Sequence, residues 1–263
     1  MNSIILGTHQ KIDRIARRKL QPFIPHGVKF PSSREMLRFE GQHGPDSIRL
    51  KTTGDCEDPK HFIDPDDPSD RDLLDMIAAH EKNLIHSLRE DAREKAAFEA
   101  AWLAHAIVDG LTPAHHYPYE EKLAELRGGQ KDQLRNTKRK RVFVPGDGLR
   151  EKVKNNVAFL GPNGLWMKHW QFETGVDLVA RPLRFSDVKL SRNDRARIRE
   201  AGGIVPLYLD IVQRIYRLNM YEEFLKKSWT RNLARQTKDK LMPTIIHTVL
   251  LSWYYCAWRA AQE

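Results

Sequence analysis

Two pairs of residues at helical spacing carry the clearest chemical signal in this chain of 263 residues. His105 and Asp109 lie four residues apart in AAFEAAWLAHAIVDGL, and His169 and Glu173 repeat that spacing in GLWMKHWQFETGVDL. A spacing of four places both side chains on one face of a helix, one turn apart. Both segments are rich in apolar residues, so we expect the pairs to point inward. A buried carboxylate is costly unless it is paired or bound to a metal. Asp109 is therefore either the partner of a histidine or an arginine, or a metal ligand.

The residues that follow Asp109 favour a metal. His115 and His116 come directly after Pro113, at the end of the same element. Two helices that each present a histidine and a carboxylate inward are a known way to build a metal site in a helical bundle. Imidazole nitrogen together with carboxylate oxygen suits Zn²⁺ better than manganese or iron. His116 remains an alternative to His115, because the two are adjacent and only their spacing separates them.

Two further segments offer ligands of the same kind. Residues 41–70 are rich in Gly, Pro and Asp and predict a long ordered loop, which is often functional. This loop contains His61 between apolar neighbours, and several carboxylates, of which most are interpreted as solvent-exposed turn residues. Asp46 is the preferred ligand among them, with Asp55 and Asp58 as alternatives. The second segment is the N-terminal one, where a histidine follows Gly-Thr.

Four short motifs, in this order, resemble those of the zinc-dependent phospholipase C superfamily, which also contains the fungal single-strand-specific nucleases. They are GTH at residues 7–9, PD at 45–46 followed by HFIDP at 61–65, H-x-x-x-D-x-x-x-x-x-H at 105–115, and H-x-x-x-E at 169–173. Each motif alone is weak, but their common order over the first 175 residues or so makes the resemblance specific. The interval between the last two motifs is longer than is usual in the family, and we interpret residues 127–164 as an inserted basic loop region.

The resemblance implies a cluster of two to three zinc ions. The implied ligands of the first ion are Asp46, His61, His105 and a bridging Asp109, and those of the second are His115, His169 and Glu173. A third ion would be held by His9, Asp109 and the amine and carbonyl of the first residue. In the family that residue is a tryptophan exposed by removal of a signal peptide, whereas this chain begins with Met1. Either Met1 supplies these groups, or the third site is weak or vacant.

The resemblance also implies a reaction, the hydrolysis of a phosphodiester by in-line attack of water on phosphorus. Zinc ions lower the pKa of a bound water to about 7 and neutralise phosphate oxygens. Asp46 would be a zinc ligand first and could also orient or deprotonate the attacking water, which makes it the predicted catalytic residue. No Ser, Cys or Lys stands out as a nucleophile, in agreement with direct attack by water.

Three functions remain open. The GTH start and the H-x-x-x-E ending favour a phospholipase C-like enzyme, which we prefer. The spacing from Asp46 to His61, the HFID sequence and the positive charge favour a single-strand-specific nuclease, which should also offer an aromatic slot for a base. Phe62, Trp166 and Trp170 are candidates for that slot. The third function is that of a non-catalytic, metal-stabilised helical module that binds nucleic acid.

Charge and composition limit the partners. The formal net charge is +9 and the pI about 9.5, so anionic partners are favoured: a phosphorylated molecule, single-stranded nucleic acid or an anionic membrane surface. The run Lys138–Arg141 could contact such a partner peripherally.

The two cysteines, Cys56 and Cys256, exclude a disulfide framework. No signal peptide is recognised at the start, so the protein stays inside the cell or the chain is already mature. We expect no transmembrane segment, since even residues 243–260 are interrupted by charge.

The elements that must position these residues are helical. Apolar spacings of three and four dominate and strand signals are scarce, so residues 1–263 predict an all-α single-domain multi-helix bundle. By resemblance it is of the zinc-dependent phospholipase C type with long metal-binding loops. The predicted helices cover residues 4–20, 32–38, a long helix capped by Ser69, about 95–111, 164–178, 191–199, 204–227 and 243–261. His80, His86 and His247 are interpreted as core histidines rather than ligands.

Overall fold

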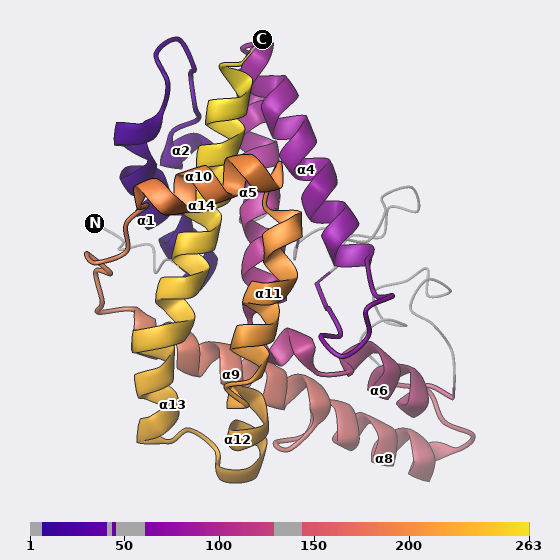
Figure 1. The fold of residues 1–263 in the computed structure, drawn as a ribbon. Helices are drawn as coiled ribbons and strands as arrows, with labels where there is room; N and C mark the ends of the chain where they lie inside the picture. The colour runs from indigo at the N-terminus through magenta and orange to yellow at the C-terminus, as the bar shows by residue number, and fades with distance from the viewer. Residues whose placement is uncertain (1–6, 41–43, 46–60, 129–143, 263) are drawn as a thin grey trace, which may run out of the picture.

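The fold is built entirely from helices in the part of the chain that the computed structural model describes, which is residues 7–40, 44–45, 61–128 and 144–262 (Figure 1). The expected all-α class is therefore confirmed for these residues. Four long helices run along the body of the molecule: α4 (Asp72–Arg89), α5 (Arg93–Leu111), α11 (Val205–Tyr216) and α14 (Met242–Ala260). No helix in the described residues is long and apolar enough to cross a bilayer.

Helix α5 is the central element of the bundle. It packs against α4, α14, α11 and α1 (Thr8–Leu20), and most of its residues are buried. Its many alanines let the neighbouring backbones approach closely, and large side chains from those helices bond to its carbonyls. The Trp253 indole donates to the carbonyl of Ala100 at 3.1 Å, and the Tyr208 hydroxyl donates to that of Ile107 at 2.9 Å. These bonds anchor the helix that carries His105 and Asp109.

The remaining helices lie around this body. They are α2 (Ser33–Met36), α6 (Tyr119–Leu126), α8 (Leu149–Leu160), α9 (Leu165–Ala180), α10 (Arg192–Ala201), α12 (Met220–Lys227) and α13 (Arg231–Gln236), with 3₁₀ turns at Gln21–Phe23, Leu37–Phe39 and Pro113–His116 and a π turn at Thr237–Leu241. Helices α8 and α9 pack together at the end of the molecule opposite the C-terminus (Figure 1).

Several predicted helix ends are confirmed by capping bonds. Ser32 and Ser191 each accept from the backbone N–H three residues later, while the acid at that position bonds back to the cap, in Ser32–Glu35 and Ser191–Asp194. Such reciprocal bonds satisfy donors that a helix start would otherwise leave unpaired. Gly164 directly precedes α9, as expected.

Other expectations about the elements were wrong. The single helix predicted over 204–227 is broken between α11 and α12, because Asn219 takes a left-handed backbone with φ of 50°, which Asn tolerates. Ser69 does not cap α4, which begins at Asp72, because its hydroxyl bonds to Asp67 within a turn at 2.7 Å. His86 is exposed rather than in the core.

The inserted region at 127–164 also differs from expectation, because its second half forms α8 instead of a loop. The buried Phe159 of α8 joins Leu123 and Val144 in a small apolar cluster, separate from the main core. Phe62 and Leu165 pack against this cluster. The cluster therefore ties α6 and α8 to the segment that contains His61.

Candidate metal centre

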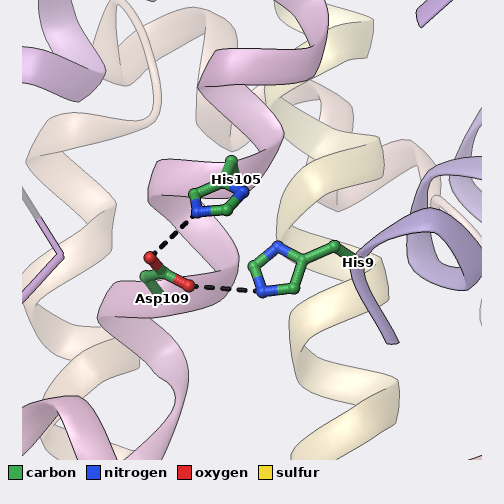
Figure 2. Close-up of side chains that lie close together, drawn as sticks. All are labelled: His9, His105 and Asp109. Atoms are coloured by element: carbon green, nitrogen blue, oxygen red, sulfur yellow. Dashed lines mark ion pairs between the residues drawn. The ribbon is translucent and has the colours of Figure 1, made fainter. Parts of the chain in front are cut away.

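The carboxylate of Asp109 is the meeting point of three histidines. Its Oδ1 lies 3.3 Å from Nε2 of His9 on α1, and its Oδ2 lies 3.2 Å from Nε2 of His105, one turn earlier on α5 (Figure 2). The same Oδ2 lies 2.5 Å from Nδ1 of His61 in the segment before α4. The Asp109 side chain is 4% exposed, so these contacts are shielded from solvent. Three separate segments of the chain thus converge on one buried carboxylate.

The pKa values of Asp109 and of the neighbouring His105 are shifted in opposite directions by their interaction. Burial alone would raise the pKa of Asp109, but the charges of His105 and His115 and hydrogen bonds from His105 and His61 outweigh it, and the pKa lies well below the ordinary value. Burial would lower the pKa of His105, yet Asp109 and Glu40 outweigh that effect and raise it well above the ordinary value. A cation held by these groups would therefore compete with the proton that Asp109 and Glu40 favour on His105.

A second group forms around Glu173 on α9, whose side chain is 41% exposed and so does not point fully inward as expected. Its Oε1 lies 3.0 Å from Nε2 of His115, in the 3₁₀ turn after α5, and 3.1 Å from Nε2 of His169, one turn earlier on α9. Burial opposes ionisation of Glu173, but hydrogen bonds from the two histidines outweigh it and lower its pKa. The local spacing of His169 and Glu173 thus becomes a three-residue group only when the turn after α5 adds His115.

The two groups are joined through the backbone near His61. The Nδ1 of His115 donates to the carbonyl of His61 at 2.6 Å, and the N–H of Ile63 donates to the carbonyl of His115 at 3.1 Å. A histidine whose second nitrogen donates to a carbonyl has a fixed tautomer and ring orientation, a common arrangement in metal ligands. These bonds hold His61 toward the first group and the Nε2 of His115 toward the second.

Both groups fit a zinc ion in their donor chemistry. In each, the ligand atoms of two histidines and one carboxylate lie within 4.8 Å of one another: His9, His105 and Asp109 in one, and His115, His169 and Glu173 in the other. Two imidazoles and a carboxylate are a combination that Zn²⁺ uses in catalytic sites. The predicted ligands Met1 and Asp46 lie outside the described residues, as do Asp55, Asp58 and the basic run at 138–141.

The rival histidines have other partners. The Nε2 of His116 donates to the carbonyl of Gly110 at 2.9 Å, and burial lowers the pKa of His116 to about 4. His116 belongs to neither group, although it follows His115 directly. His80 bonds to Glu99 at 2.7 Å, as expected for a core histidine, and His247 lies half-buried 3.4 Å from Asp194.

Two buried carboxylates beside the first group were not predicted. Glu40 is 2% exposed in its side chain, and its Oε2 lies 3.4 Å from Nδ1 of His105. Asp13 is fully buried one turn after His9, and burial, with the charge of Glu40, raises its pKa well above the ordinary value. The spacing of His9 and Asp13 matches that of His105 and Asp109, which was a usable signal. No sequence pattern pointed to Glu40, which is 65 residues from His105.

Aromatic side chains border the second group. The ring of Phe62 stacks on that of His115, with centroids 5.0 Å apart, and lies 5.9 Å from His169. Trp166 lies three residues before His169 and Trp170 one residue after it. Both are exposed and their rings are nearly parallel, with centroids 6.4 Å apart.

Comparison with known proteins finds no matching family model, no matching curated protein and no matching solved structure.

Proposed function

We propose that this protein is a zinc-dependent phosphodiester hydrolase of the phospholipase C type. The observation that carries the proposal is the pairing of two histidine–carboxylate groups, held side by side by the mutual bonds of the segments around His61 and His115. A single structural zinc would need only one such group. Two neighbouring groups suit chemistry on a phosphate, whose several oxygens need simultaneous neutralisation.

The two carboxylates of the described groups have different parts in this proposal. Asp109 directs one oxygen toward His9 and the other toward His61 and His105. In the three-ion arrangement that the resemblance implies, its two oxygens would serve different ions. Glu173 serves the second group alone. Bound zinc would supply a water of lowered pKa and a Lewis acid for the phosphate. Asp46 stays the proposed residue that orients the attacking water.

The preferred substrate is a phospholipid, by resemblance of the motifs. Single-stranded nucleic acid is the second candidate, and the aromatic rings beside the second group favour it. Phe62 is partly buried against His115, while Trp166 and Trp170 present their rings to solvent. Bases stack on such rings without sequence preference.

The test begins with metal content. Purified full-length protein should contain two to three zinc ions per chain by mass spectrometry, and Asp109→Asn should lose more zinc than Glu173→Gln, because Asp109 serves more histidines. The zinc-loaded protein should hydrolyse a short-chain phosphatidylcholine, and the activity should disappear on chelation and return with zinc.

The alternatives separate in the same experiment. Activity on single-stranded DNA without activity on phosphatidylcholine would replace the preferred substrate with the second. Zinc without activity on either substrate would leave a specialised small phosphodiester or phosphomonoester as substrate, or the metal-stabilised, non-catalytic module. A protein that takes up no zinc even after reconstitution would refute both enzyme functions.

A further inference from the structure

Helix α8 turns an apolar stripe toward solvent. Leu149, Val153 and Val157 recur at every fourth position and are 81%, 57% and 59% exposed. That spacing places them on one face of the helix. A surface helix of a globular protein normally turns such a stripe toward the core. Here Phe159 provides the buried contact instead, and the stripe has no cover within the described structure.

Basic side chains flank this stripe. Arg150 and Lys154 are exposed and each follows a stripe residue directly, which places them along one edge of it. Lys152 is exposed on the other edge. Over α8 the four charged residues comprise three cations and one anion, Glu151. An apolar stripe bordered by Lys and Arg is the pattern of a helix that lies in a membrane interface.

Helix α9 adds exposed tryptophans next to α8. Trp166 and Trp170 are 42% and 49% exposed, and α9 packs against α8 (Figure 1). Tryptophan is enriched at the level of lipid headgroups, where its ring is partly apolar and partly hydrogen-bonded. Two adjoining helices at one end of the molecule therefore expose side chains suited to that environment.

We infer that the outer face of α8, aided by the tryptophans of α9, docks this protein on an anionic lipid membrane. The three aliphatic side chains decide between a membrane and a nucleic acid. Phosphates, sugars and base edges offer little to Leu and Val side chains, whereas the acyl boundary of a bilayer removes them from water. Anionic headgroups would meet Arg150, Lys152 and Lys154 at the same depth.

Docking would also set the position of the metal centre. Phe159 of α8 packs in the small apolar cluster that Phe62 joins, and Phe62 stacks on His115. The outer face of α8 is thus linked through that cluster to the second group, beside which the tryptophans of α9 lie. The docking itself needs no metal and no hydrolysis, so it stands apart from the proposed function.

The test is co-sedimentation of the full chain with vesicles. Wild type should bind vesicles of phosphatidylcholine with phosphatidylglycerol, and bind pure phosphatidylcholine more weakly. The variant L149S/V153S/V157S should bind the anionic vesicles at least about tenfold more weakly, because it no longer buries the stripe. Arg150→Gln with Lys154→Gln should reduce the preference for the anionic lipid.

The control is L178S/L209S, which removes two exposed leucines that lie outside α8. It should bind vesicles as wild type does, which separates the α8 stripe from surface hydrophobicity in general. The replaced side chains are exposed, so thermal melting should be unchanged; Val153→Asp serves as a second variant if the triple variant does not fold. Equal vesicle binding by the stripe variant and the control would overturn the inference. So would stripe variants that lose affinity for a single-stranded oligonucleotide instead of for vesicles.

Discussion

Adjacent histidines in one short turn allow a closely matched test of the metal centre. His115→Gln removes an imidazole whose Nε2 lies 3.0 Å from Glu173, and His116→Gln removes one whose Nε2 bonds to the carbonyl of Gly110. Both side chains are buried, at 5% and 8% exposure, in the same 3₁₀ turn. The two substitutions therefore alter side-chain volume alike and differ in the proposed metal contact and in the bond from His115 to the His61 carbonyl.

The expected loss for His115→Gln follows from its contacts. It supplies one of three described ligands, and structural zinc sites are worth about 10–16 kcal/mol, so one ligand represents about 4 kcal/mol, or about 10³-fold in affinity. Its Nδ1 bond to His61 at 2.6 Å would also be lost or weakened, at about 1 kcal/mol. We expect one zinc ion fewer per chain and a loss of most phosphodiesterase activity.

His116→Gln should keep its zinc and its activity, since the glutamine amide can also donate to the Gly110 carbonyl. Zinc per chain by mass spectrometry, competition with a chromogenic chelator and hydrolysis of phosphatidylcholine give three readouts. Circular dichroism confirms that both variants are folded. Equal zinc loss in the two variants, or zinc loss in His116→Gln alone, would refute the assignment of His115.

Two further predictions concern buried carboxylates. Glu40→Gln should weaken zinc binding about 10–100-fold without lowering the number of zinc ions bound per chain at saturating zinc, because Glu40 orients His105 without belonging to the first group. Competition with a chelator measures the zinc affinity, and an unchanged affinity would contradict this role of Glu40. Burial raises the pKa of Glu81 to about 7 from 4.5, so the folded state binds this proton more tightly than the unfolded state. The resulting stability is fully present below pH 4.5 and is lost as pH rises through 7, by about 3 kcal/mol. Glu81→Gln should remove this loss in urea unfolding at pH 5 and pH 8, and a pH dependence equal to that of wild type would contradict it.

Short-range features of this protein could be predicted from the sequence, because they depend on neighbours within one or two turns. The spacing of four in His105–Asp109 and His169–Glu173 sets each pair on one helix face whatever the rest of the chain does. Ser32 and Ser191 begin helices because their hydroxyls satisfy the first free N–H groups. The helical class follows from the same local periodicity.

The breaks in the helices and their solvent-exposed faces were harder to predict from the sequence. Asn219 interrupts a continuous apolar pattern through a left-handed backbone that a spacing argument does not register. Half of the residues of helix α8 are charged or amide side chains, and the helix follows a polar stretch, so it looked like part of a loop. That its stripe faces outward depends on Phe159, which finds a cluster assembled from α6 and the segment before α8.

The candidate centre itself was decided by tertiary structure. In the sequence only motif spacing separates His115 from His116, and the turn after α5 directs one to Glu173 and the other to the Gly110 carbonyl. Glu40 reaches His105 across 65 residues, a contact that no local pattern encodes. Local spacing sets the direction of a side chain on its own helix, while the meeting of side chains from different helices depends on how the apolar faces pack. The sequence alone therefore determined the two pairs at one-turn spacing, and the packing of α1, α5 and α9 brought His9 and His115 to them.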